Sequence, residues 1–477
     1  IGKASKADCI KCPSEKSTGT DKGNTAKAAC LCKKTEYYQD SDGMCHRCPT
    51  GANCSSRNGI ALSETFALPG YWRPRSEGEV FSSCAAGYSS LDSEALAKAR
   101  CCPLNLTSNV SICETLENST SILNLNDQCL EGYAGPLCLI CSKEYAKMGN
   151  ECVHCPDGTS VSLATIPLLL VSILIFVGHL VFMLCGKKAV TGANEANTYF
   201  GQLKIILSFL QIFSSMPSVL NGVPWPTFFL TFTNPLTSLN FDLLGSLSDV
   251  SCRLSIRFFD QFLLHMIMPL CLILMVLLAW IVASRCTKKA DKEKRSLLKQ
   301  ETSKAAIVLI MLIFPGLATK IFTMFKTVQV HGLNSETHSG YVLAADYEIE
   351  AFGSEHMPYI VAAFVFLGIY VLGIPLAIFL ILWKNKKHLH NEKSPRHEIV
   401  KFALGGLYSQ YEHKFWWFEI FLLFNKTMMC GGLVMAAPGT PFQVLLSVLI
   451  MLFHLLVVLK LSPYVSQSED WTSFMSS

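Results

Sequence analysis

The cysteines divide this chain into two parts that must fold by different rules. Sixteen of the 21 cysteines lie between Cys9 and Cys155, and only five are spread over the remaining two thirds. That second part holds the long apolar stretches, so the whole chain has a mean hydropathy of +0.34 with 16% charged residues. An ordinary soluble domain has about 25% charged residues. We therefore expect a polytopic membrane protein that carries a cysteine-rich segment before its membrane region.

The cysteine-rich segment repeats a short pattern. The stretches 30–51 and 138–158 each contain a close cysteine pair, a tyrosine, a second close pair and a Cys-Pro-x-Gly turn, and residues 9–13 form a partial third copy. Units of roughly 25 residues bury too little apolar surface to fold unaided, so covalent cross-links are expected to stabilise them.

Two chemistries could use these cysteines. Cys138, Cys141, Cys152 and Cys155 have a spacing that suits a zinc ribbon as well as a disulfide module. The same segment carries glycosylation sequons at Asn53, Asn105, Asn109 and Asn118. Glycosylation and disulfides belong to the same oxidising compartment, which favours disulfides over metal. The sixteen disulfide candidates are Cys9, Cys12, Cys30, Cys32, Cys45, Cys48, Cys54, Cys84, Cys101, Cys102, Cys113, Cys129, Cys138, Cys141, Cys152 and Cys155. Their connectivity stays open, as does the partner of Cys252 in a later loop.

Two runs in this segment resemble a known kind of ectodomain. Residues 67–73 read Ala-Leu-Pro-Gly-Tyr-Trp-Arg, and residues 129–138 include Gly-Tyr-Ala-Gly-Pro-Leu-Cys. Both resemble the ectodomains of multipass membrane proteins of algae, ciliates and oomycetes, which carry EGF-like or ephrin-receptor-like cysteine modules. In such modules the second run is a tight turn with an aromatic ring against a disulfide, so we interpret it as scaffold and not as a ligand site.

Seven stretches after Val161 are expected to cross the membrane. A hydrocarbon core of about 30 Å requires roughly 20 apolar residues. The expected spans are 161–184, 203–220, 262–283, 305–325, 359–383, 415–436 and 441–461. The second is the most polar, because Lys204, Ser208, Gln211 and Ser215 share one face, which must contact protein or water.

The basic residues predict the orientation. Loops 185–204, 284–304 and 384–414 contain 18 Lys and Arg, whereas loops 221–261 and 327–358 contain two. Under the positive-inside rule the first three loops are cytoplasmic. The cysteine-rich amino terminus is then extracellular, in agreement with the disulfide argument.

Two groups of polar residues in the membrane part are candidate functional sites. Glu419, Asn425 and Lys426 fall within the sixth expected span, and Glu419 and Lys426 are two helical turns apart on one face. They could form a structural ion pair that locks two helices, or part of a path for an ion or ligand. The outer loop 327–358 holds five carboxylates and no Lys or Arg; they are Glu336, Asp346, Glu348, Glu350 and Glu355. These carboxylates would attract cations at a pore mouth, or they belong to a solvated acidic loop.

The membrane part extends the resemblance. Its motifs include Tyr-Val-Leu-Gly-Ile-Pro at 370–375, the aromatic segment 407–419 and Leu-Ser-Pro-Tyr at 461–464. They resemble the multipass portion of the same proteins, which is described as similar to transient-receptor-potential (TRP) channels. The resemblance implies a TRP-like, cation-permeable membrane protein, although residues 437–440 leave no room for a selectivity filter between the last two spans.

No catalytic motif for nucleotide binding, proteolysis or acyl transfer occurs, so an enzyme is not expected and no cofactor or metal is assigned. Three functions compete. The first is a TRP-like cation channel or channel-like subunit, the second a membrane anchor or assembly subunit for an extracellular structure, and the third a seven-helix receptor.

The expected fold is therefore a set of small disulfide-rich extracellular modules followed by an all-α polytopic transmembrane bundle of about seven helices. The domains are 1–156, the ectodomain; 157–464, the helical domain; and 465–477, a cytoplasmic tail or the start of a further part. The expected cellular location is the plasma membrane or another secretory-pathway or ciliary membrane. Expected partners are membrane lipid, N-linked glycans, cations for a channel, and further subunits or an extracellular assembly. A net charge of +4 gives no reason to expect nucleic acid.

Overall fold

The computed structural model describes residues 11–19, 29–74, 78–87, 92–105, 110–115, 125–148, 151–155, 193–220, 223–240, 257–286, 292–333 and 340–475. The chain divides into two compact units. Unit 1 comprises Ile1–Cys155, Pro224–Thr227 and Thr327–His356, and unit 2 comprises Pro156–Val223, Phe228–Lys326 and Met357–Ser477. Each unit is described by itself below.

Unit 1 is built from short antiparallel hairpins. The first pairs are β1 (Lys16–Ser17) with β2 (Leu31–Cys32), β3 (Tyr37–Gln39) with β4 (Cys45–Arg47), β5 (Ala52–Asn53) with β6 (Phe66–Ala67), and β7 (Tyr71–Trp72) with β8 (Ser82–Ser83). Two more are β9 (Tyr133–Ala134) with β10 (Ile140–Cys141), and β11 (Tyr145–Met148) with β12 (Glu151–His154). Two short helices, α1 (Ser93–Arg100) and α2 (Ile112–Thr115), lie between them in the sequence. Strands this short need cross-links, because a lone hairpin is at best marginally stable.

Seven disulfides between described residues cross-link these hairpins, and each joins cysteines that are consecutive in the sequence. The pairs are Cys12–Cys30, Cys32–Cys45, Cys48–Cys54, Cys84–Cys101, Cys102–Cys113, Cys129–Cys138 and Cys141–Cys152. Cys155 is also disulfide-bonded, to a partner outside the described residues, where Cys9 and Cys252 also lie. Closing a loop of about 15 residues stabilises a fold by about 3 kcal/mol. Because Cys138 and Cys141 have different partners, the described cysteines form bridges and not a zinc site.

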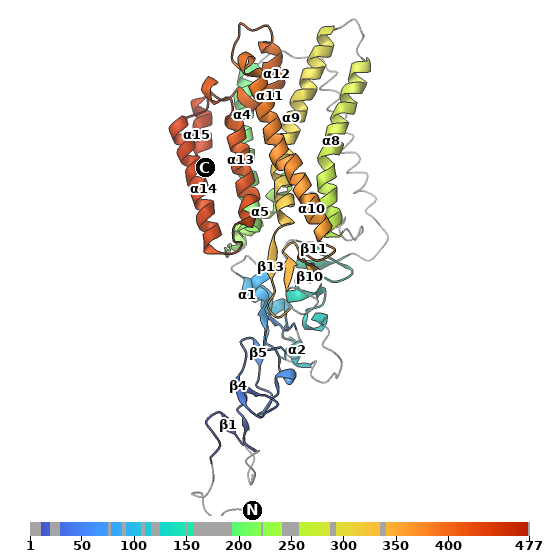
Figure 1. The fold of residues 1–477 in the computed structure, drawn as a ribbon, viewed down its shortest axis with the longest axis vertical. Helices are drawn as coiled ribbons and strands as arrows, with labels where there is room; N and C mark the ends of the chain where they lie inside the picture. Colours follow the sequence, from blue (N-terminus) through green and yellow to red (C-terminus); the bar gives the residue numbers. More distant parts are fainter. Residues whose placement is uncertain are drawn as a thin grey trace, which may run out of the picture. The chain divides into compact units, whose positions relative to one another are not determined.

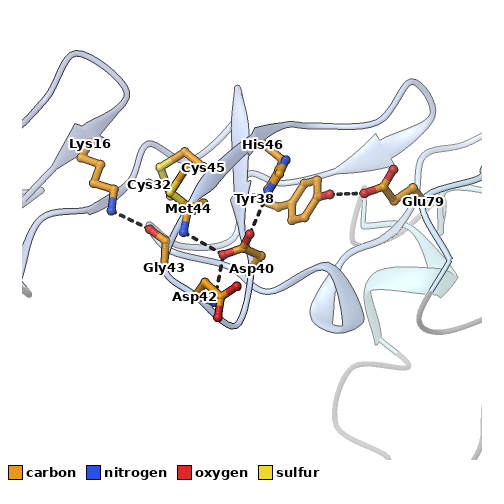
Figure 2. Close-up of polar contacts among 10 residues, drawn as sticks. All are labelled: Lys16, Cys32, Tyr38, Asp40, Asp42, Gly43, Met44, Cys45, His46 and Glu79. Atoms are coloured by element: carbon orange, nitrogen blue, oxygen red, sulfur yellow. Dashed lines mark hydrogen bonds and ion pairs between the residues drawn. A yellow bond between two sulfur atoms is a disulfide. The ribbon is translucent and has the colours of Figure 1, made fainter.

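Polar contacts support the disulfides in the β3–β4 hairpin. Figure 2 shows the Asp40 carboxylate at its tip, accepting a bond from the Met44 backbone N–H at 2.7 Å and contacting His46 Nε2 at 2.8 Å. The bond to His46 lowers the pKa of Asp40. On the same hairpin the Tyr38 hydroxyl donates to Glu79, and burial with this carboxylate raises the pKa of Tyr38 to about 12. These contacts hold the hairpin in shape and leave the Tyr38 hydroxyl protonated at neutral pH.

The motifs that resemble the algal and ciliate ectodomains are structural. Trp72 is fully buried in the core beside the Cys84–Cys101 and Cys129–Cys138 bridges. Arg73 donates to the carbonyl of Leu62 at 2.9 Å and lies over the Phe81 ring, and burial lowers its pKa to about 10. Gly132 and Gly135 adopt positive φ around Tyr133, whose ring is covered by Arg100. Both runs therefore contribute buried residues to this core, in line with the scaffold interpretation of the second run.

The acidic loop is part of unit 1, although the sequence suggested a continuous helical domain over 157–464. It forms a three-stranded meander of β13 (Thr327–Gln329), β14 (Tyr341–Leu343) and β15 (Asp346–Glu350). Val330 and Val342 are buried in the same core as Trp72. Strand β15 of this loop contacts β10, although about 200 residues separate them in the sequence. We call Thr327–His356 the inserted meander.

Unit 2 is helical. Its longer helices are α4 (Ala193–Val219), α8 (Phe258–Cys286), α9 (Lys292–Thr323), α11 (Gly373–Leu389) and α14 (Pro441–Leu461). The shorter ones are α5 (Thr227–Leu236), whose first residue belongs to unit 1, α10 (Met357–Phe366), α12 (His397–Tyr408), α13 (Phe418–Cys430) and α15 (Gln467–Met475). A π-helical turn at Leu367–Leu372 joins α10 to α11. Figure 1 shows α13 beside α4, and the two helices are in contact.

Four segments among the described residues are long and apolar enough to cross a membrane: Phe258–Val282, Ala306–Thr323, Met357–Leu389 and Pro441–Leu461. They match four of the seven expected spans. Only 17% of the last one is buried, against 44% of the second, so α14 presents an apolar face outward while α9 lies inside the bundle. Such a face is suited to lipid.

The other three expected spans are not confirmed. The first, 161–184, lies outside the described residues. The second lies in α4, which is not among the four candidate spans. Its polar face contacts protein, because Gln211 Nε2 donates to Leu239 O and Leu312 O. The sixth, 415–436, is not one continuous helix, because α13 has 13 residues and ends before Gly431. A helix of that length spans about 20 Å, short of a bilayer core.

The segment 465–477 is not a free tail in its described part. Its helix α15 packs on α4 and α14, with Glu469 and Ser473 buried. Unit 2 therefore extends past residue 464, where the sequence suggested a boundary. The aromatic stretch before α13, which suggests an interfacial belt, also turns inward: Phe415, Trp416 and Phe418 are buried and only Trp417 is exposed.

We predict that Gly51→Ala destabilises unit 1 strongly. Gly51 has φ +90°, and a Cβ there would lie 2.2 Å from Tyr71 Cδ1. The left-handed backbone costs a non-glycine residue about 1–2 kcal/mol, and the overlap adds about 1–3 kcal/mol. Gly43→Ala is the matched control, because Gly43 has φ +76° but its Cβ would meet only Gln39 Nε2 at 3.6 Å. Protease digestion of the purified chain against temperature measures both; equal midpoints would contradict the packing argument.

We also predict that a substitution in the inserted meander destabilises the cysteine-rich segment. Val342→Ala removes part of a side chain that is 1% exposed in the core with Trp72, at a cost of about 2 kcal/mol. Glu348→Ala, on the exposed side of β15, should cost less than about 0.5 kcal/mol. The readout is proteolysis of residues 29–155 under non-reducing conditions. Undiminished resistance in Val342→Ala would mean that the meander contributes nothing to this core.

Candidate functional site

A cluster of buried charges connects α4 and α13. Glu419 lies in the first turn of α13 and is 2% exposed, and Lys204 lies on the polar face of α4 and is 17% exposed. Lys204 Nζ lies 2.5 Å from Glu419 Oε2 and also donates to the carbonyl of Gly406 in α12 at 3.1 Å. The position of Glu419 is favourable, because carboxylates near a helix amino terminus interact well with the helix dipole. One ion pair therefore joins three helices.

A tyrosine completes the coordination of Glu419. Tyr411 is fully buried, and its hydroxyl donates to Glu419 Oε2 at 2.8 Å. Gln410 Nε2 donates to the Tyr411 oxygen at 2.6 Å. Burial, reinforced by the Glu419 carboxylate, raises the pKa of Tyr411 well above its usual value. The hydroxyl thus remains a donor throughout the physiological range, and the Glu419 side chain contacts both a cation and a neutral donor.

The Leu-Ser-Pro-Tyr motif closes this cluster. The Glu412 backbone N–H donates to Pro463 O at 2.8 Å, and that of Val465 donates to Gln410 O at 2.9 Å. The Tyr464 ring lies 5.2 Å from the Tyr411 ring. Beyond it, the Glu469 carboxylate of α15 interacts electrostatically with Lys204, and burial raises its pKa. The motif therefore covers the ion pair and separates it from the surroundings.

Lys426 lies near this ion pair without joining it. Lys426 and Asn425 are buried, with 8% and 7% exposure, and belong to the same face of the bundle as Glu419. Lys426 is attracted by Glu419 and repelled by Lys204. Within the part of the chain that the structure describes, no hydrogen bond or ion pair reaches the Lys426 ammonium. The ion-pair partner of Glu419 is therefore Lys204, on another helix, and not Lys426.

Two cavities border the cluster. A polar cavity of about 60 Å³ is lined by Glu419, Asn425 and His454, among others. The His454 Nδ1 atom has no hydrogen-bond partner among the described residues, and its ring stacks on Phe421. An apolar cavity of about 200 Å³ lies between α4, α9 and α12, and Lys204, Ser208 and Lys426 line both cavities. The polar cavity has room for a few water molecules, and the apolar cavity has room for part of a small ligand.

The remaining candidate residues are spread over unit 1. Asp346, Glu348 and Glu350 lie along β15, Glu355 follows it, and Glu336 lies outside the described residues. Asn53 lies in β5 and accepts hydrogen bonds from the Ser55 N–H and hydroxyl. Asn105 precedes an undescribed stretch that contains Asn109, and Asn118 is also outside the described residues. The structure therefore does not gather these residues into one site.

Sequence reasoning missed Lys204, Tyr411 and Gln410 as members of the cluster. A signal existed for Lys204, since it lies on the polar face of the second expected span, and a buried carboxylate needs a buried cation. No such signal exists for Tyr411, because nothing local shows that its hydroxyl turns inward.

Comparison of the chain with protein families, curated proteins and solved structures finds no match. The resemblance to algal, ciliate and oomycete membrane proteins therefore rests on its short motifs alone.

We predict an unequal response to breaking the ion pair. Glu419→Gln leaves two buried lysines beside a neutral amide, and it should cost about 3–5 kcal/mol of unfolding free energy. Lys204→Met should cost less, because Glu419 keeps the Tyr411 hydroxyl and the attraction of Lys426. The exposed Lys414–Glu412 pair, 3.0 Å apart, is the control, and Lys414→Met should cost less than about 1 kcal/mol. Thermal unfolding in detergent ranks the three variants, and a cost for Lys204→Met above that for Glu419→Gln would contradict the assignment.

Proposed function

We propose that this chain is a subunit of a cation-permeable, TRP-like membrane channel whose disulfide-bonded ectodomain acts on the helix bundle through the inserted meander. The inserted meander is the main support for this proposal. It belongs to unit 1, yet both of its ends continue directly into apolar helices of unit 2.

The linkers between meander and helices are short. Three residues separate the end of α9 at Thr323 from β13 at Thr327, and Met357 at the start of α10 directly follows His356. The α9 side of this connection is also fixed, because Lys326 Nζ donates to Ser218 O at 2.7 Å. Short, anchored linkers transmit displacement, whereas a flexible linker would absorb it. A load or ligand on unit 1 would therefore act on α9 and α10.

One of these helices contains a place where it can bend. The π-helical turn Leu367–Leu372 interrupts the long apolar segment Met357–Leu389. Such turns occur often at functional sites, since their backbone bonding is irregular. A Cβ at Gly368 would meet no atom within 4 Å, so the turn is not packed tightly at that position. We assign this turn as the hinge that converts motion of the meander into motion of α11.

Topology and location follow from the charge distribution. The positive-inside count puts unit 1 outside the cell and the segments around Lys288 and Lys387 inside. We accordingly propose a multipass protein of the plasma membrane or of a secretory-pathway or ciliary membrane. Its ectodomain would carry N-linked glycans, and the carboxylates of β15 would raise the local cation concentration at the outer face.

The closed ion pair supports a second candidate, an anchor or assembly subunit for an extracellular structure. The Oε2 atom of Glu419 is bound by both Lys204 and Tyr411, which is the arrangement expected for a structural ion pair that locks helices together. An ion path through a single chain at this point is therefore disfavoured, and the channel proposal places the pore between subunits. The seven-helix receptor ranks below both.

Purified chain in planar bilayers tests the proposal. We expect a cation-selective conductance under voltage, tension or a ligand of unit 1. Gly332→Val should alter its open probability roughly fivefold or more while leaving the single-channel conductance unchanged. Gly332 has φ +81°, and a Cβ there would lie 2.6 Å from Pro74 Cγ, so the variant disturbs the packing of the meander against Pro74.

Glu348→Ala, on the exposed side of β15, is the control and should gate as the parent does. No measurable conductance of the parent chain under voltage, tension or ligand would overturn the channel proposal. Recovery of an extracellular assembly bound to the folded, silent chain would establish the anchor instead.

A further inference from the structure

The apolar cavity is lined by two lysines, Lys204 and Lys426, and only Lys204 has an ion-pair partner among the described residues. Lys204, which also lines it, is paired with Glu419 and Gly406 O. The Ser208 hydroxyl donates to Lys204 O at 2.7 Å, and both hydrogen bonds of Gln211 Nε2 go to backbone carbonyls. Lys426 lines the same cavity at 8% exposure, and the described residues offer its ammonium no hydrogen-bond acceptor. Buried charges normally have a partner, because desolvation of an isolated ion is costly.

The neighbouring acids do not supply that partner. Glu419 Oε2 already accepts bonds from Lys204 and Tyr411 and acts on Lys426 only at longer range. Glu469 interacts electrostatically with Lys204, whereas the charges that act on Lys426 are those of Glu419, Lys204 and Cys430. Cys430 Sγ accepts a bond from the Ser215 hydroxyl. The cavity therefore presents a single unneutralised ammonium to whatever enters it.

The remaining wall is hydrocarbon. Leu207 of α4, Val308 and Met311 of α9 and Ala403 of α12 line the cavity. Leu203 also lines it and is 60% exposed, so the cavity opens at that point to the surroundings of α4. An anion that fits here must carry an apolar body, because free phosphate or chloride would leave this wall unfilled.

The volume of the cavity limits the ligand to one hydrocarbon chain. The cavity holds about 200 Å³, somewhat more than the roughly 150 Å³ of an engineered cavity that binds benzene. It can take a headgroup and the adjoining part of one hydrocarbon chain, with the rest passing Leu203. The bulk of a two-chain phospholipid does not fit.

We propose that this cavity binds a long-chain carboxylate, with the carboxylate on the Lys426 ammonium and the chain between α4, α9 and α12. The proposal is independent of channel activity. Occupancy would neutralise Lys426 and fill the space between three helices, which stabilises this arrangement of the bundle.

The test uses the purified full chain in detergent, with cis-parinaric acid as the fluorescent probe and its methyl ester as the uncharged analogue. We expect saturable binding of the acid, with the ester at least about tenfold weaker. Lys426→Met should weaken binding of the acid about tenfold while leaving that of the ester unchanged. Methionine has a similar length and removes a buried charge, so this variant should fold. Lys414→Met is the control, because Lys414 is an exposed lysine, and it should bind like the parent.

A second variant tests the cavity without changing any charge. Val308→Phe fills part of the space and should weaken binding of acid and ester alike, and this comparison with the ester decides the question even if Lys426→Met fails to fold. Equal affinity for acid and ester, or full binding by Lys426→Met, would overturn the assignment of the charge. Displacement of the probe by phosphatidic acid or inorganic phosphate at lower concentration than by oleate would contradict the proposal that the ligand is a single-chain carboxylate.

Discussion

The helical unit depends on the burial of one carboxylate. Glu419 is 2% exposed, and taking such a group out of water costs several kcal/mol unless charges and donors compensate. The compensation comes from three separate places: Lys204 on α4, Tyr411 before α13, and the 462–465 segment that covers both. None of these segments can move away alone without exposing or isolating a charge. The requirement to neutralise Glu419 therefore fixes how α4, α13 and the carboxyl-terminal helix α15 pack together.

Unit 1 is stabilised in a different way. Its strands of two to five residues cannot build a large core, and sequential disulfides close each loop where it lies. Such local bridges stabilise individual hairpins but leave them weakly connected to one another. The long-range connection comes instead from buried apolar residues around Trp72, among which Val330 and Val342 are supplied by the inserted meander. Cross-links and core thus have separate tasks.

Much of this could be predicted from the sequence, and the remainder has clear physical reasons. Cysteine spacing and sequons indicated disulfides, and apolar length indicated four helices that the structure contains, because both signals are local. The ion pair was harder, since Lys204 and Glu419 are 215 residues apart and only tertiary packing brings them together. The inserted meander is hard to predict as a sheet, because its five carboxylates suggest either a cation-attracting pore mouth or a solvated acidic loop. Its alternation of Tyr347 and Ile349 with Asp346, Glu348 and Glu350 is the strand signal that those charges obscured.

The inserted meander also has a consequence for the order of synthesis. A ribosome completes the cysteine-rich segment more than 170 residues before it reaches Val330 and Val342. The disulfides can form early, yet the core around Trp72 lacks two of its valines until α9 has been made and inserted. In the proposed topology, maturation of unit 1 is thus conditional on correct insertion of α9. A chain whose α9 failed to insert would keep an incomplete apolar core around Trp72, a state that chaperones could recognise.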